Sequence, residues 1–193
     1  MAVKNAYDAI VMGASAGGLY VLISILKQLP PDFSIPVIVV QHRSKDERSL
    51  LEEVLQPKCK VHIKQADEKE PIQGGFVYFA PPGYHLLVEN DATFSLSCDA
   101  PVNYSRPSID VLFETAADVF KQRLLGIILT GANKDGARGI RKISLLGGTT
   151  IAQQIDTADY PDMPQFAINT GCVQHIMTPD AIGLFLVKCM NRS

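Results

Sequence analysis

Short apolar runs alternate with helically spaced apolar residues along most of this 193-residue chain. The runs at 10–12, 35–40 and 124–130 are rich in Ile, Val and Leu, as strands buried on both faces of a parallel sheet usually are. Each run is followed by a segment in which apolar residues recur every three or four positions, which predicts an amphipathic helix. This alternation indicates a parallel sheet with helices on both faces.

The helices are predicted from apolar stripes and from residues typical of helix ends. The segment 48–56 offers one such stripe, formed by Leu50, Leu51, Val54 and Leu55. Another strand is predicted at 149–154. An earlier stripe is formed by Leu19, Leu22, Ile23 and Leu26, and Pro30 and Pro31 end that helix. A helix over 108–120 is capped by Ser108, and a further helix ends at Gly147 and Gly148. The last helix begins with Thr178 and Pro179.

The middle of the chain has a different pattern. The segments 75–82, 85–90 and 93–98 are short and β-like, and Asn90 and Asp91 are good turn formers between the last two. This spacing predicts an antiparallel hairpin. We therefore expect the α/β class: a three-layer α/β/α sandwich around a mostly parallel, doubly wound sheet, with an antiparallel hairpin.

Composition limits the size, the environment and the partners. A chain that is 47% hydrophobic can bury one core, which predicts a single domain over 1–193. The 18 basic and 20 acidic residues leave no excess of positive charge for nucleic acid or an anionic membrane. The four cysteines lie far apart, and neither a signal peptide nor a membrane-spanning run is found. We expect a cytoplasmic protein with reduced thiols, no metal and no membrane insertion.

The glycine-rich turn "GASAGG" after the first apolar run has two interpretations, a phosphate cradle or a mount for a nucleophile. A dinucleotide fingerprint needs a second glycine where Ser15 stands. It also needs an acidic residue where the second strand ends in Gln41 and His42. No G-K-[ST] ending of a P-loop follows. Nucleotide binding is therefore the weaker alternative, and no cofactor is expected.

Three chemically useful residues follow three of the predicted strands: Ser15, His42 and Asp135. The carboxyl ends of parallel strands meet at one edge of a sheet, so these residues are expected to converge there. A serine needs a base to accept its proton, and the base needs a carboxylate to fix its tautomer. Each residue also has a structural interpretation, since Asp135 suits a turn and a histidine often only packs; His62 and His175 are expected to be such strand or edge residues. A helix is expected to begin directly after the serine, and the N–H groups of its first turn, near Ala16 and Gly17, are candidate oxyanion donors.

The sequence strongly resembles the catalytic domain of the CheB family of chemotaxis receptor methylesterases. The similarity lies in "MGASAGG", "VVQH", "FVYFAPPGYHLLV", "RPSIDVLFETAA", "ILTGANKDGARG" and "IAQQIDTADYPDMPQFAI", in the family's order. The resemblance implies hydrolysis of glutamate methyl esters on the cytoplasmic helices of methyl-accepting chemotaxis receptors, with related deamidation of glutamines. It assigns Ser15, His42 and Asp135 as the catalytic residues. No receiver domain is expected in this chain, so a separate receiver or methyltransferase module is a candidate partner.

Several positions depart from the family pattern or have two interpretations. Ala132 and Asn133 stand where methionine and glycine are usual, and the resemblance makes the Ala132 N–H a second oxyanion donor. Arg43 and Asp162 also replace usual family residues. Arg106 and His85 lie in family-like segments and are candidate substrate contacts. The alternatives are that Arg106 pairs with a carboxylate and that His85 bonds to backbone. The competing hypothesis for the whole chain is a non-catalytic binding module of the same fold in a signalling complex.

Overall fold

A seven-stranded sheet runs through the centre of the computed structural model, which describes residues 6–43 and 51–190. All neighbouring strands in it are parallel, in the order β3-β4-β2-β1-β7-β8-β9. The buried, branched residues of the central strands fit this two-sided burial. The strands are β1 (Ala9–Ala14), β2 (Val37–Gln41), β3 (His62–Gln65), β4 (Phe76–Phe79), β7 (Leu124–Ile128), β8 (Thr149–Gln153) and β9 (His175–Met177).

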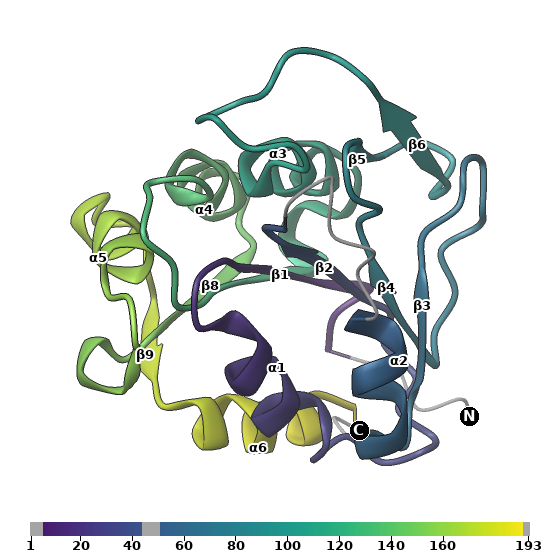
Figure 1. Ribbon diagram of the computed structural model, residues 1–193, viewed down its shortest axis with the longest axis horizontal. Helices are drawn as coiled ribbons and strands as arrows, with labels where there is room; N and C mark the ends of the chain where they lie inside the picture. Colours follow the sequence, from purple (N-terminus) through teal and green to yellow (C-terminus); the bar gives the residue numbers. More distant parts are fainter. Residues whose placement is uncertain (1–5, 44–50, 191–193) are drawn as a thin grey trace.

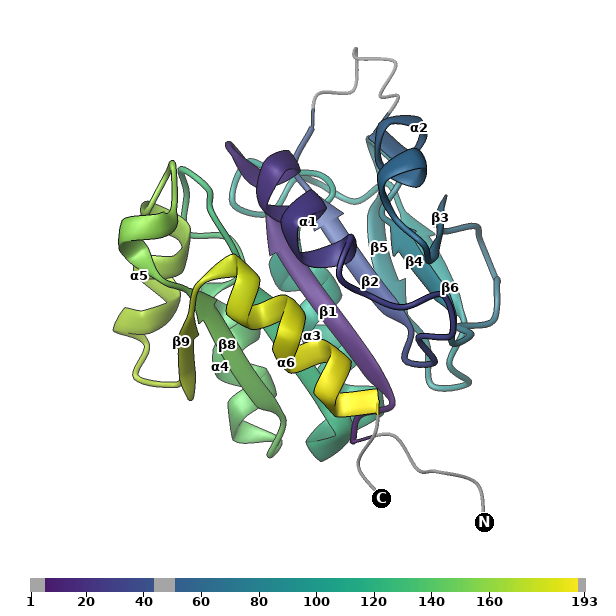
Figure 2. The same cartoon turned by 90° about the horizontal axis from the view of Figure 1, so that it is seen from below.

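Helices cover both faces of the sheet (Figure 1). One face carries α1 (Gly18–Leu26), α2 (Leu51–Leu55) and α6 (Pro179–Met190), whose apolar residues pack with alternate residues of the strands. Figure 2 shows α1 and α6 lying across this face. The opposite face carries α3 (Ile109–Phe120), α4 (Ala137–Leu145), α5 (Asp162–Asn169) and the antiparallel hairpin of β5 (His85–Val88) and β6 (Phe94–Ser97). The predicted three-layer sandwich with its hairpin is confirmed.

Most details of the predicted elements are confirmed, and three are corrected. Val54 is 42% exposed, so it is not part of the buried stripe of α2; Leu50 lies outside the described residues. The helix α1 begins only at Gly18. Ser108 does precede α3, but its hydroxyl makes no capping bond because it is used elsewhere. None of the helices within the described ranges is long and apolar enough to cross a membrane.

The strand order reverses between β1 and β7, and this reversal determines where a site can form. The chain leaves β1 toward α1 on one face of the sheet and leaves β7 toward α4 on the other. Loops that diverge in this way leave a crevice between the carboxyl ends of the two strands. The residues after β1, β2 and β7 therefore surround the expected position of a site.

Candidate active site

Ser15 lies in the tight turn between β1 and α1. Its N–H donates to Thr130 O at 3.0 Å, which extends the pairing of β1 with β7 beyond the ends of the two strands. Gly17 has φ 76, a left-handed conformation that glycine adopts without strain, and this lets the chain turn sharply into α1. A Cβ atom on Gly131 would lie 2.9 Å from Ser15 Cβ. Glycine at 131 is therefore needed for the two turns to approach each other.

His42 follows β2 directly and lies next to the serine turn. The parallel register places Ala14 opposite Gln41, and the N–H of His42 donates to Ala14 O at 2.9 Å. The side chain of Gln41 fastens the two strand ends together, because its Nε2 donates to the carbonyl oxygens of Ser15 at 2.8 Å and of His42 at 3.1 Å. The role of Gln41 was not predicted, although its place just before the candidate base was a usable signal in the sequence.

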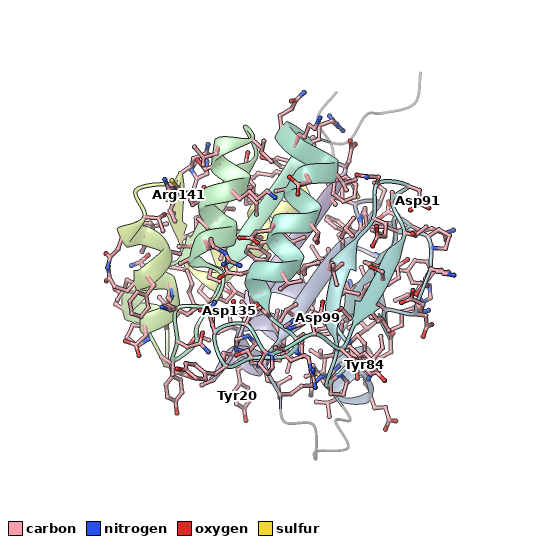
Figure 3. The ribbon with its side chains drawn as sticks, turned by 90° about the horizontal axis from the view of Figure 1, so that it is seen from above. Tyr20, Tyr84, Asp91, Asp99, Asp135 and Arg141 are labelled. Carbon is pink, nitrogen blue, oxygen red and sulfur yellow. The ribbon has the colours of Figure 1, made fainter. Side chains whose placement is uncertain are left out.

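Asp135, after β7, is completely buried and bonds directly to the imidazole of His42. Asp135 lies near the start of α3 (Figure 3). The backbone N–H groups there have no partners inside the helix, and those of Ile109 and Asp110 donate to its carboxylate. This contact explains why Ser108 caps no helix end. The groups around the carboxylate are His42 Nε2 at 2.9 Å, Ile109 N at 2.7 Å, Asp110 N at 3.1 Å, Ser108 Oγ at 2.9 Å and Asn103 Nδ2 at 3.1 Å.

The surroundings of Asp135 keep it ionised. Burial by itself raises the pKa of a carboxyl group, because it removes the charged form from water. The hydrogen bond and charge of His42, with the N–H groups of Ile109 and Asp110, outweigh burial and hold the pKa of Asp135 below its usual range. An ionised carboxylate only accepts hydrogen bonds, so His42 Nε2 carries the proton in their contact. The other ring nitrogen, Nδ1, is then the one with a free lone pair.

A cavity of about 460 Å³ opens beside His42. Its Nδ1 lies 3.3 Å from Asn133 Nδ2 and 3.4 Å from Ser105 Oγ. Within the described part of the chain, no hydrogen bond joins the Ser15 hydroxyl to His42. The three predicted residues thus meet at one edge of the sheet, and only His42 and Asp135 are directly bonded. The cavity is lined by Ser15, His42, Arg43, Pro101, Tyr104, Ser105, Arg106, Pro107 and Asn133.

A two-residue turn brings further side chains to this site. Val102 and Ser105 exchange two backbone hydrogen bonds, and between them Asn103 and Tyr104 have φ 49 and φ 63. Two successive left-handed residues form a tight hairpin turn that sends neighbouring side chains to opposite sides. Asn103 reaches inward to Asp135, whereas Tyr104 is fully exposed at the cavity. Asn103 was a usable sequence signal, since asparagine tolerates this conformation.

The predicted oxyanion donors are the backbone N–H groups of Ala16 and Ala132. Ala16 precedes the left-handed Gly17, so it lies before the first turn of α1 and not in it. Among residues 6–43 and 51–190, no hydrogen-bond acceptor faces either N–H group. Their part in binding an oxyanion stays a prediction.

Arg106 lines the cavity, and its contacts differ from the expected ion pair. Its Nη1 donates to the carbonyl oxygens of Cys98 at 2.6 Å and Asp99 at 2.8 Å. It forms no ion pair within the described ranges, so the alternative that it pairs with a carboxylate is wrong. Arg43, by contrast, pairs with Glu52 at 2.9 Å. The guanidinium of Arg106 is therefore held by backbone carbonyl oxygens at the edge of the cavity.

His85 lies beneath this region, not on the cavity wall. It is only 2% exposed, its Nε2 lies 3.1 Å from Ala100 O, and its Nδ1 accepts from the N–H of Ser108 at 3.1 Å. The interpretation of His85 as a backbone-bonding residue is confirmed. Contact with a substrate is not compatible with this placement, because both ring nitrogens already have partners.

Asp110 is a second buried carboxyl group close to the first. It accepts from the N–H of Gly139 at 2.8 Å, and Asn103 Nδ2 bridges it to Asp135 with distances of 2.9 Å and 3.1 Å. Burial, aided by the negative charge of Asp135, raises the pKa of Asp110 to about 6, against the opposite effect of the Gly139 N–H. The folded protein therefore binds a proton here at a pH where the unfolded chain does not.

This raised pKa predicts an unusual dependence of stability on pH. Between about pH 6 and pH 4 the folded state takes up a proton at Asp110 before the unfolded state does, so this group adds stability as the pH falls. The expected gain is on the order of 2 kcal/mol, and Asp110→Asn should lack it. Urea unfolding of both proteins from pH 7 to pH 4 measures the difference. A difference in unfolding free energy that does not change with pH would contradict this assignment.

Within the described residues, no group of three or more His, Cys, Asp and Glu side chains is arranged to hold a metal ion. The site consists instead of a buried carboxylate, an imidazole whose Nδ1 carries no proton, and serine hydroxyls at a cavity. This combination, on a strand-to-helix turn of a parallel sheet, is typical of serine hydrolases.

The comparisons with known proteins specify the family. The family model described as CheB methylesterase matches residues 10–186, and the chain belongs to that family. A relative from Leptospira interrogans is 46% identical over 94% of both chains. One from Clostridium acetobutylicum, named protein-glutamate methylesterase/protein-glutamine glutaminase, is 33% identical over 97% of this chain and 54% of its own length. The crystal structure of the Thermotoga maritima CheB methylesterase catalytic domain matches with a TM-score of 0.90 and 32% identity, over 94% of this chain and 98% of that one.

Proposed function

We propose that this protein hydrolyses methyl esters of glutamate side chains on the cytoplasmic helices of chemotaxis receptors, and that it also deamidates receptor glutamines. The observation that carries the proposal is the 2.9 Å contact of His42 with a buried, ionised Asp135, which leaves Nδ1 as the proton acceptor beside a cavity that Ser15 also lines. The names of the relatives supply the substrate class.

The reaction proceeds in two acyl-transfer steps. Ser15 Oγ attacks the ester carbonyl carbon while His42 Nδ1 takes the hydroxyl proton. The tetrahedral intermediate collapses, the bond to the methoxy group breaks, and His42 returns the proton to give methanol. Water then attacks the acyl-enzyme with His42 again as the base, which releases glutamate and restores the serine. Asp135 fixes the ring tautomer and stabilises the imidazolium that forms twice.

Two further groups have roles in this proposal. The N–H groups of Ala16 and Ala132 bind the negative oxygen of each tetrahedral intermediate, where preorganised donors have their largest effect. Arg106 has no carboxylate partner among the described residues, and it attracts acidic side chains near the esterified glutamate. The methyl leaving group is small, so no deep pocket is required for it.

Two measurements on the unmodified chain test the proposal. Incubation with a methylated receptor fragment is expected to release methanol, and a fluorophosphonate probe is expected to modify one serine, which peptide mass spectrometry should locate at Ser15. Only a hydroxyl activated by a base reacts with such a probe. A protein that binds the fragment, releases no methanol and remains unmodified would instead be a binding module.

A further inference from the structure

The side-chain amide of Asn133 lies against the one nitrogen of His42 that the proposed reaction needs. Its Nδ2 is 3.3 Å from His42 Nδ1, and both residues line the cavity together with Ser15. Neither the proposed nucleophile nor the proposed oxyanion donors account for this contact. It concerns the base directly, because Nδ1 is the nitrogen that receives the serine proton; the Ser105 hydroxyl lies slightly farther from it, at 3.4 Å.

The orientation of the Asn133 amide is fixed by a second contact. The backbone N–H of Asp135 donates to Asn133 Oδ1 at 2.9 Å, so the oxygen end of the amide is held away from the ring. The NH₂ end must then face His42. Because His42 Nε2 carries its proton toward Asp135, Nδ1 can only accept. Asn133 therefore donates a hydrogen bond into the lone pair of Nδ1.

This lone pair is the one that must receive the proton of Ser15. Once it does, the imidazolium has an N–H at Nδ1 that faces the N–H of Asn133, and the contact becomes donor against donor. We infer that Asn133 is a positioning residue that restrains the base: it holds His42 in a neutral resting state and slows proton transfer from Ser15. The inference rests on the proposed serine chemistry.

Apart from the backbone N–H of Asp135, which donates to Asn133 Oδ1, the other charged and titratable groups near His42 make no hydrogen bond with Asn133 within the described ranges. Asp135 bonds to Nε2, while Arg43 is neutralised by Glu52 and shares the cavity with Arg106 and Tyr104. Asn133→Asp keeps an oxygen for the Asp135 N–H, so in that variant these groups act as they do in the wild type. A change in the pH dependence between these proteins can thus be assigned to the Asn133 contact.

Two substitutions separate the effect on the base from a general effect on structure. Asn133→Ala removes the donor, and also the acceptor for the Asp135 N–H. Asn133→Asp keeps an oxygen for that N–H but places a carboxylate beside Nδ1, where it favours the protonated ring. Lys134→Ala is the matched control, because Lys134 follows in the same turn with an exposed side chain that does not line the cavity.

The rate of fluorophosphonate labelling of Ser15 between pH 5 and pH 9 tests the inference on the full chain. At pH 8, Asn133→Ala is expected to label about three- to tenfold faster than the wild type, since one hydrogen bond no longer opposes proton transfer. The acid limb of the profile should move to higher pH in Asn133→Ala and further in Asn133→Asp. Lys134→Ala should match the wild type.

The possible failures are distinguishable. Labelling of the wild type that Asn133→Ala does not accelerate, or acid limbs that coincide in all variants, would overturn the restraint alone. Slower labelling of Asn133→Ala with an unchanged acid limb would mean that the amide assists the reaction, which also overturns it. No labelling in any protein would overturn the proposed serine chemistry, and the inference with it.

Discussion

Replacement of Ser15 by alanine is expected to lower methanol release by about 10⁴-fold or more, because the nucleophile of a serine hydrolase acts as one unit with its base. Ser105→Ala is the matched control. Ser105 lines the same cavity, and its hydroxyl is 3.4 Å from His42 Nδ1, so the structure offers it as a rival nucleophile. We expect Ser105→Ala to retain activity within about tenfold, in keeping with the loss of one weak hydrogen bond.

The backbone around the two serines is the reason to favour Ser15. The N–H of Ala16, next to Ser15, has no acceptor among the described residues, so it is available to an oxyanion. Ser105 lies in a hairpin turn, where its own N–H donates to Val102 O at 2.9 Å, and not in a strand-to-helix turn like that of Ser15. Both variants should keep the thermal stability of the wild type. Loss of methanol release in Ser105→Ala, with activity retained in Ser15→Ala, would reverse the assignment.

The sequence predicted the layers of the fold but not the order of its strands. The apolar runs marked the central strands because burial on both faces requires continuous branched residues. The same logic could not show that β4 (Phe76–Phe79) inserts between β2 and β3, since a pattern of burial does not specify which strand is the neighbour. The prediction that Val54 is buried was wrong for a related reason. Helical spacing identifies one face of α2, but it does not show how much of that face the rest of the protein covers.

The meeting of Ser15, His42 and Asp135 was predictable, because parallel strands bring their carboxyl ends to one edge. The side chains that surround these three were not. Asn103, Gln41 and Ser105 reach the site through turns and strand pairing whose geometry depends on the tertiary fold. The Asn133 amide was visible in the sequence only as an unusual residue, while its contact with His42 depends on the way the Asp135 N–H orients it.

Replacement of Asp135 by asparagine is expected to lower the labelling rate of Ser15 by about 10³- to 10⁴-fold. The amide NH₂ can donate to His42 Nε2, which places the ring proton on Nδ1 and removes the lone pair that receives the serine proton. Asparagine also has only one acceptor oxygen for donors that include Ile109 N at 2.7 Å and Ser108 Oγ at 2.9 Å. We therefore expect a loss of about 3 kcal/mol in unfolding free energy at pH 7.

The effect of Asp135 on stability should also depend on pH, in the direction opposite to that of Asp110. The pKa of Asp135 is lower in the folded state than its ordinary value of 3.8. Its contribution to the free energy of unfolding is therefore complete above pH 3.8, and it is lost only as the pH falls through the lower pKa of the folded state. Urea unfolding at pH 7 and pH 3 and probe labelling at pH 8 measure both effects. Asp110→Asn is the control for the labelling rate, since Asp110 is a buried carboxyl group without contact to His42. If Asp135→Asn labelled at more than a tenth of the wild-type rate, Asp135 would not be what fixes the tautomer of the base.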